Sequence, residues 1–128
     1  MEIGKGSDGF HAIDEGGRTL TLVHGAQGGF HVDLALQARA MDASEPWEGT
    51  LVGTVEGETR GEEHQYLDMR CNGPENALQV WGVRLVWDVE DPAEMDDVLV
   101  DIEVSVLDAA GTEAATRVED VMVEDPEL

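Results

Sequence analysis

Apolar and polar residues alternate with a period of two along most of this chain, and this pattern limits the folds that it can adopt. The clearest apolar row is Phe30, Val32, Leu34, Leu36 and Ala38. A second row takes every other residue from Val98 to Val106, and all of its members are β-branched. Successive side chains of a β-strand point to opposite faces, and β-branched residues favour strands over helices. The pattern therefore predicts an all-β protein.

Weaker alternation in the rest of the chain brings the expected total to about eight strands, separated by turns rich in Gly, Asp, Asn and Pro. The weaker segments are residues 10–13, 18–24, 50–56, 65–71, 78–87 and 113–123. The connections leave no room for crossover helices, so each sheet must bury one face against another sheet. We predict a two-layer antiparallel β-sandwich; an up-and-down β-barrel is the alternative, because no local pattern fixes the strand order.

Two local signals refine this prediction. The apolar phase changes between Val118 and Val121, which predicts a β-bulge at Glu119 and Asp120. The opening nine residues are rich in Gly and polar, so we expect residues 1–9 to form a flexible segment and residues 10–128 to form one domain.

The charge of the chain restricts its partners and favours export. Asp and Glu number 29 and Lys and Arg number 7, so the net charge is −22. Nucleic acids and anionic lipids bind through Lys and Arg, so the charge excludes them as partners. The longest apolar runs are far shorter than the roughly 20 residues of a membrane span. An acidic surface with Lys5 as its one lysine is typical of secreted or salt-tolerant proteins. We expect a periplasmic, extracellular or surface-anchored protein whose N-terminal segment follows an export signal or a lipid anchor.

Two segments carry a family resemblance. The hairpin Val100–Ala114, with its Asp108–Gly111 turn between alternating valines, resembles the closing strands of bacterial immunoglobulin-like and fibronectin type III-like domains. The segment Leu22–Val32 looks like a turn of uncharacterised bacterial lipoproteins and secreted β-domains. The resemblance implies an immunoglobulin-like β-sandwich and export, and it implies no reaction. The paired cysteines of antibody domains are missing, since Cys71 is the one cysteine.

Histidines give the first candidate site. His11, His24, His31 and His64 all fall in or beside expected strands. Imidazole binds zinc and copper well, and three converging rings suffice for a site. His24 and His31 flank one turn, so they can approach each other across a hairpin, with His11 or His64 as a third ligand. By the alternation, His31 points away from the core and His24 lies at the core margin. Isolated histidines at strand ends are the alternative.

An acidic connection between two expected strands gives the second candidate site. It contains Asp88, Glu90, Asp91, Glu94, Asp96 and Asp97. Calcium prefers several carboxylate and carbonyl oxygens, and loops at the end of a sandwich can gather them. Within this stretch, Pro92 suits the start of a helical turn and Asp91 suits its N-cap. A solvated acidic loop is the alternative.

Tryptophans give the third candidate site. Trp81, Val83, Leu85 and Trp87 are expected on one face of a strand that is apolar on both sides. Either this strand is central and buried on both faces, or it presents an apolar patch to a partner or a sugar ring. Trp47, in a long connection, can join either arrangement.

No constellation typical of catalysis stands out in the sequence. There is no phosphate-binding glycine loop, and the serines lie outside any nucleophile elbow. We therefore predict a non-enzymatic, exported domain that presents loops or a sheet face to a protein, glycan or surface partner. The alternative is a metal-binding periplasmic or secreted domain that holds copper or zinc through histidine, or calcium through the acidic connection.

Overall fold

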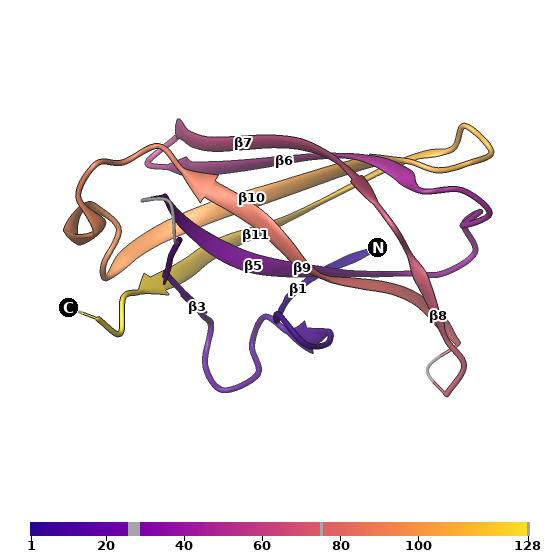
Figure 1. Cartoon of the computed structure of the whole chain (residues 1–128), viewed down its shortest axis with the longest axis horizontal. Coiled ribbons are helices and arrows are strands. Elements are labelled where there is room, and N and C mark those ends of the chain that lie inside the picture. The colour runs from indigo at the N-terminus through magenta and orange to yellow at the C-terminus, as the bar shows by residue number, and fades with distance from the viewer. Residues whose placement is uncertain (26–28, 75, 128) are drawn as a thin grey trace.

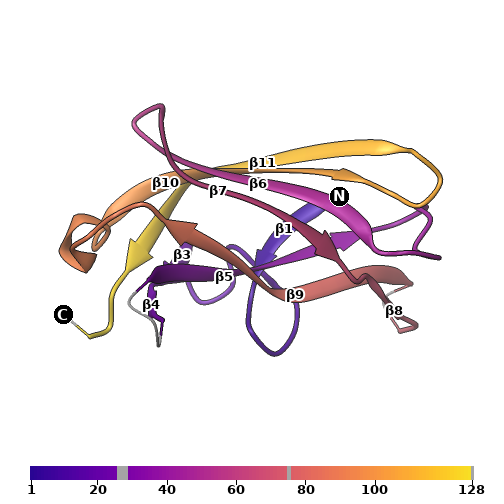
Figure 2. The same cartoon turned by 45° about the horizontal axis from the view of Figure 1, so that its top comes forward.

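A computed structural model describes residues 1–25, 29–74 and 76–127, and it places their strands in two sheets that pack face to face (Figure 1). Figure 2 shows the two layers, with β6, β7, β10 and β11 in one and β4, β5, β8 and β9 in the other. Neither layer closes into a barrel within the described residues. The chain is therefore an all-β sandwich, as the alternation predicts. Residues 26–28 of the segment Leu22–Val32 lie outside the described residues.

Strand β5 (Phe30–Ala38) is the centre of the first sheet. One edge of β5 pairs with β9 (Ala77–Trp87), and the other edge pairs with β1 (Glu2–Lys5) and then with β4 (Val23–His24). The sheet is completed by β2 (His11–Ala12) beside β1 and β8 (Arg70–Asn72) beside β9. All of these pairs are antiparallel.

The N-terminal segment differs from expectation, because Glu2–Lys5 is a paired strand of the first sheet. Ile3 pairs with Leu36 and is buried in the core. Residues 2–5 thus pair with the free edge of β5 while Ile3 joins the core. The flexible segment expected over residues 1–9 therefore does not include β1.

The second sheet has the order β3, β11, β10, β6, β7. Its strands are β3 (Thr19–Thr21), β11 (Glu113–Glu124), β10 (Val98–Leu107), β6 (Trp47–Val55) and β7 (Glu58–Leu67). The pairing of β3 with β11 is parallel, and the other pairs of this sheet are antiparallel. The sandwich is therefore antiparallel except at this one edge.

The inner faces of both sheets form one hydrophobic core. The first sheet contributes the predicted row of β5, and the second contributes the β-branched row of β10, whose Val100, Ile102 and Val104 are almost fully buried. Burial of this apolar surface, worth about 25 cal/mol for each Å², is what holds the two layers together.

The hairpin that joins β6 to β7 was missed by the sequence pattern, which expects a strand at residues 65–71 instead. Glu56 and Gly57, at the turn, both have positive φ angles, of 52° and 81°. Two such residues are typical of the type I′ turn that suits the twist of a hairpin. The cue was weak because Asn or Asp, and not Glu, is the usual residue before the glycine.

The β-bulge predicted in the last strand is confirmed. The register of β10 and β11 shifts between Val100 and Ile102, so that Asp101 faces two residues, Glu119 and Asp120. Asp120 has a φ of 53°, and its N–H donates a 3.0 Å hydrogen bond to the Asp101 carboxylate. A local side-chain acceptor thus compensates the lost ladder bond.

The acidic connection between β9 and β10 contains a single turn of 3₁₀ helix, Pro92–Glu94, with Asp91 as its N-cap, as predicted. The Asp91 side chain accepts the N–H of Ala93, and the Glu94 side chain accepts the N–H of Asp91. Within the described residues, no helix is long and apolar enough to cross a membrane.

Candidate functional site

A β-bulge in β9 turns Trp81 to the outer face of the first sheet. The register of β5 and β9 shifts between Leu34 and Leu36, where Trp81 and Gly82 lie opposite a single residue. Gly82 has a φ of 65°, which glycine adopts without strain. The extra residue reverses the alternation, so that Trp81 is only half-buried while Val83 is in the core. The prediction that these two share one face is therefore wrong.

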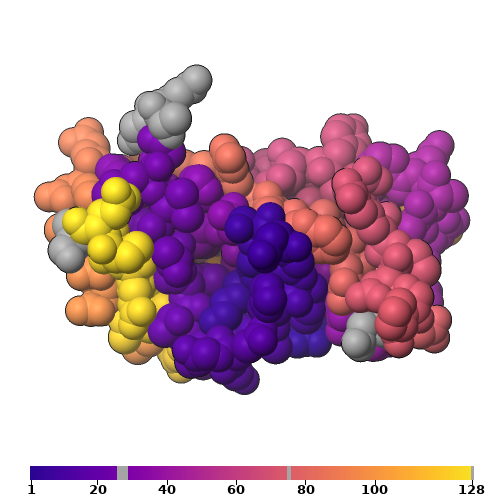
Figure 3. Space-filling model, turned by 60° about the horizontal axis from the view of Figure 1, so that its bottom comes forward, coloured from indigo at the N-terminus to yellow at the C-terminus, as the bar shows by residue number. Residues whose placement is uncertain are grey.

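The same bulge holds the N-terminal loop against the sheet. The N–H of Gly82 donates a 2.9 Å hydrogen bond to the carbonyl of Gly6, and the N–H of Gly6 reaches the carbonyl of Asp33 at 3.3 Å. The loop after β1 therefore crosses the outer face of β5 to reach β9. Figure 3 shows these N-terminal residues, in indigo, beside the salmon region of β8 and β9.

An open hollow of about 600 Å³ lies between the N-terminal hairpin and strand β9. Its lining combines two aromatic rings, three side-chain amides and one carboxylate. The lining residues are Glu2, Gly9, Phe10, Ala12, Gln37, Asn72, Gln79 and Trp81. We call this set the Trp81 hollow.

The floor of the Trp81 hollow is a chain of three hydrogen-bonded amides. Asn72 Nδ2 donates to Gln79 Oε1 at 3.1 Å, and Gln79 Nε2 donates to Gln37 Oε1 at 2.6 Å. Gln79 is only 7% exposed, so its side chain is fixed between the other two. Each amide offers two N–H donors and a carbonyl acceptor, so the chain retains donors at Gln37 and an acceptor at Asn72.

The two rings of the hollow are also held in place. The guanidinium of Arg70 lies over the Trp81 ring, 5.8 Å from its centroid, which is within the range of a cation–π contact. The Phe10 ring lies against Gly4, where any side chain would clash with it and with the carbonyl of His11. Both rings are therefore positioned before any ligand arrives.

The other two tryptophans that were candidates for recognition lie in the core. Trp47 is fully buried at the start of β6, and its Nε1 donates a 2.7 Å hydrogen bond to the carbonyl of Asp42. Trp87 is 2% exposed. Neither ring reaches the surface, because both strands direct these positions to the other sheet. Of the three, only Trp81 is available to a partner.

The four histidines do not converge. In the pairing of β4 with β5, Val23 lies opposite His31 and His24 lies opposite Phe30. Because neighbouring residues of a strand alternate, His24 and His31 lie on opposite faces of the first sheet. The prediction that these two rings meet across the hairpin is therefore wrong.

Each of the other three histidines has its own surroundings. His31 is 6% exposed, contrary to the expectation that it faces water. Its Nε2 lies 3.5 Å from an oxygen of Asp33, two residues along the same strand. His11 lies in β2 beside Glu15, and His64 lies on the exposed face of β7 beside Thr50.

His24 instead meets two acidic residues from the end of the chain. Its Nε2 lies 2.8 Å from Asp125 Oδ2, and its Nδ1 lies 3.3 Å from Glu127 Oε2. The edge of the ring contacts Phe30, with centroids 5.0 Å apart. We call His24, Asp125 and Glu127 the His24 cluster; among the described residues it is the one group of three His, Cys, Asp or Glu ligand atoms that all lie within 4.8 Å.

Asp125 is ionised at this position. Burial works to raise its pKa, but the hydrogen bond from the backbone N–H of Glu127 and the contacts with His24 outweigh it, so the pKa lies below its ordinary value. The Asp125 side chain is completely enclosed, whereas the Glu127 side chain is 62% exposed. A fixed negative charge therefore faces the His24 ring.

The acidic connection uses three of its carboxylates within the protein. Asp91 caps the 3₁₀ turn, Glu94 accepts the N–H of Asp91, and Asp96 accepts the backbone N–H of Asp125 at 2.9 Å. In residues 1–25, 29–74 and 76–127, no other three acidic or histidine side chains have ligand atoms within 4.8 Å of one another. Calcium binding at this connection stays a prediction.

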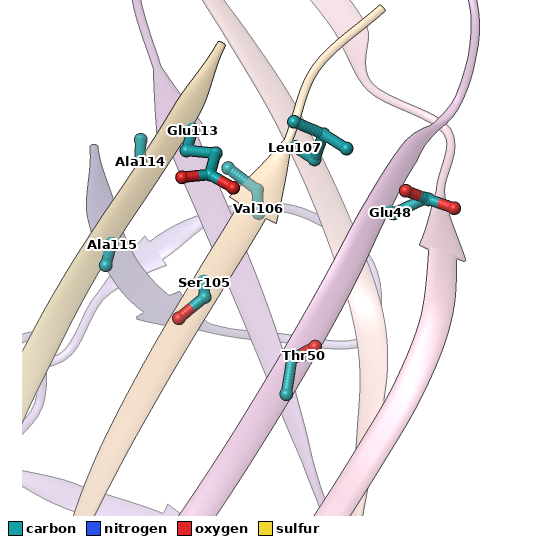
Figure 4. A pocket seen from close by; sticks show the side chains of 8 residues that line it. All are labelled: Glu48, Thr50, Ser105, Val106, Leu107, Glu113, Ala114 and Ala115. Carbon is teal, nitrogen blue, oxygen red and sulfur yellow. The ribbon is translucent and has the colours of Figure 1, made fainter. Parts of the chain in front are cut away.

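A second hollow, of about 590 Å³, lies on the outer face of the second sheet (Figure 4). The strand register sets Ser105 between Thr50 and Ala115. Because these side chains are small, they leave a depression on the outer face of the sheet. Two exposed carboxylates, Glu48 and Glu113, flank Leu107 in the neighbouring row. The described lining has no aromatic ring, so this hollow lacks the ring and amide pairing of the Trp81 hollow.

The amides of the Trp81 hollow were missed by the sequence analysis. The sequence pattern gives no site role to Gln37, Asn72 or Gln79. The available signal was Gly82, a glycine inside a largely apolar strand, which suggests a bulge or a close backbone approach.

When the chain is compared with family models, with curated proteins and with solved structures, it matches none of them. The resemblance to immunoglobulin-like and fibronectin type III-like domains stays a prediction.

Proposed function

We propose that this chain is a non-enzymatic binding domain and that the Trp81 hollow binds a neutral glycan. One observation carries the proposal: a half-exposed indole and a fixed chain of three amides line the same hollow on a sheet face. Sites for small ligands typically combine apolar surface with a few placed polar groups. The Trp81 hollow has both.

The chemistry of the lining favours a sugar over other ligands. A pyranose ring presents C–H groups on its faces and hydroxyls at its rim. The indole of Trp81 offers an apolar, electron-rich surface to the C–H face. The amides of Gln37 and Asn72 offer donors and acceptors, which is what pairs of hydroxyls need.

Charge selects a neutral sugar over an acidic one. Arg70 lies over the Trp81 ring, but Glu2 is the one ionisable residue of the lining itself, and the whole chain carries a net charge of −22. Sialylated, sulfated or phosphorylated glycans would meet repulsion both at Glu2 and from the protein field. A neutral sugar can accept hydrogen bonds from the amides and donate one to the carboxylate.

Binding without hydrolysis fits the same lining. Glycoside hydrolysis generally needs two carboxyl groups on opposite sides of the scissile bond. The Trp81 hollow offers one, Glu2. We propose that the domain acts outside the cytoplasm, where neutral glycans of cell surfaces are accessible, in line with its acidic surface.

A glycan array followed by calorimetric titration of the best hits tests the proposal. We expect neutral oligosaccharides to bind the intact protein and Trp81→Ala to lose at least tenfold in affinity. Tyr66→Ala is the matched control, since Tyr66 is an aromatic residue that is 74% exposed on the other sheet. Absence of binding to any neutral glycan, or equal loss in both variants, would refute the proposal.

A further inference from the structure

The His24 cluster joins the two sheets at one end of the sandwich. His24 ends β4 of the first sheet, whereas Asp125 and Glu127 follow β11 of the second. The N–H of Leu22 donates a 2.8 Å hydrogen bond to the carbonyl of Glu124, which aligns the two segments. The cluster therefore lies at a position that the backbone fixes from both sides.

The two nitrogens of the His24 ring have different partners. Nε2 is hydrogen-bonded to Asp125 Oδ2 at 2.8 Å, whereas Nδ1 lies 3.3 Å from Glu127 Oε2. In a neutral ring whose Nε2–H donates to Asp125, Nδ1 presents its lone pair to the Glu127 carboxylate. Two electron-rich atoms then face each other, and a cation between them removes the repulsion.

We propose that Nδ1 of His24 and Oε2 of Glu127 bind a late first-row divalent metal such as zinc, with Asp125 orienting the ring. A histidine that ligates a metal usually donates its other N–H to a carboxylate, a backbone carbonyl or water, and Asp125 supplies such an acceptor. An imidazole nitrogen beside a carboxylate suits zinc or copper(II) better than calcium, which prefers oxygen ligands alone.

The spacing of the two ligand atoms agrees with this assignment. Two ligands bound to zinc at about 2.0–2.1 Å with a tetrahedral angle lie roughly 3.3 Å apart. The observed separation of Nδ1 and Oε2 is 3.3 Å. The ion would need little movement of either side chain, and water would complete its coordination.

Burial keeps the ring in place while leaving the ion accessible. The His24 side chain is 30% exposed and the Glu127 side chain is 62% exposed, whereas Asp125 is enclosed. Asp125 is held in turn, since Oδ1 accepts the N–H of Glu127 and its own N–H donates to Asp96. The site is therefore open to solvent on the side of Glu127. Two protein ligands and water predict moderate affinity.

Titration of the full chain with zinc chloride, after chelator treatment, tests the proposal by calorimetry in 150 mM NaCl with excess magnesium. We expect one zinc per chain and a higher melting temperature. Both His24→Gln and Glu127→Gln should lose at least tenfold in affinity. Glu127 is exposed, so its variant tests the site even if His24→Gln weakens the fold.

His11→Gln is the matched control, because His11 also lies between two acidic residues, at 2.9 Å from Glu15 and 3.5 Å from Asp8. We expect this variant to bind zinc as the parent does. Equal losses in His11→Gln and His24→Gln would mean that the acidic surface gathers zinc without a site, which overturns the proposal. Absence of zinc binding by the parent would also overturn it.

Discussion

The carboxylate of Asp108 accepts a hydrogen bond from the backbone N–H of Asp42 at 3.0 Å, across 66 residues of sequence. Its other oxygen accepts the N–H groups of Ala110 and Thr112, within the turn that joins β10 to β11. A single side chain thus closes this hairpin and fastens it to the connection before β6. Since Asp108 is 7% exposed, replacing it leaves these N–H groups without acceptors.

We predict that acid destabilises the protein through Asp108 and Asp42. Hydrogen bonds from the backbone N–H groups of Asp42 and Thr112 hold the pKa of Asp108 below its ordinary value of 3.8, and those from Ser44 do the same for Asp42. Groups with a lowered pKa in the folded state contribute stability that is fully present above the unfolded pKa and is lost as the pH falls through the folded one.

Urea unfolding at pH values from 7 to 2 measures this effect. Stability should begin to fall as the pH drops to about 4 and should continue to fall below it. Asp108→Asn should be less stable at pH 7 and should show a shallower fall in acid. An identical acid profile in the variant and the parent would contradict the role of Asp108.

Trp81 and Trp87 should respond very differently to truncation. Trp87 is 2% exposed in the core, so Trp87→Ala should cost about 3–5 kcal/mol. Trp81 is half-buried on the outer face, so Trp81→Ala should cost about 1 kcal/mol. Denaturant unfolding of both variants gives the comparison. Similar losses of stability in the two variants would show that Trp81 is a core residue and would contradict the proposed binding surface.

Gly53 should tolerate no side chain, because it lies under the ring of Trp87. A Cβ at this position would lie 2.5 Å from two atoms of that ring and 3.0 Å from Leu85 Cδ2. Overpacking of this kind costs about 1–3 kcal/mol, so Gly53→Ala should lower the free energy of unfolding by that amount. Gly73→Ala is the control, since a Cβ there meets no atom within 4 Å. Equal stability of the two variants would show that the Trp87 ring moves freely.

Two bulges show why only part of this structure is predictable from the sequence. The bulge at Glu119 and Asp120 separates apolar residues on a strand with one buried face, so the apolar phase visibly changes. The bulge at Gly82 separates Trp81 from Val83, which are both apolar, and no change of phase can be seen. The Trp81 hollow depends on the second bulge and was therefore missed.

The His24 cluster was half predicted, for a different reason. His24 was recognised as a metal-ligand candidate, but its partner Asp125 lies 101 residues away. Their meeting depends on the parallel pairing of β3 with β11, which no local pattern encodes. The sequence predicts residue chemistry and the faces of regular strands, and it does not predict which strand ends come together.

Gly82→Ala should link the bulge to the position of Trp81. Gly82 has a φ of 65°, where a side chain costs about 1–2 kcal/mol, so urea unfolding should show a loss of that size. Relaxing this strain disturbs the backbone beside Trp81, and the indole N–H resonance of Trp81 should shift in the folded state. Gly111→Ala is the matched control, because Gly111 has a φ of 84° in the β10–β11 turn and nothing lies within 4 Å of its Cβ position. It should lose similar stability and leave that resonance unchanged. An unshifted Trp81 resonance in Gly82→Ala would mean that the N-terminal loop and Arg70 position the ring without the bulge.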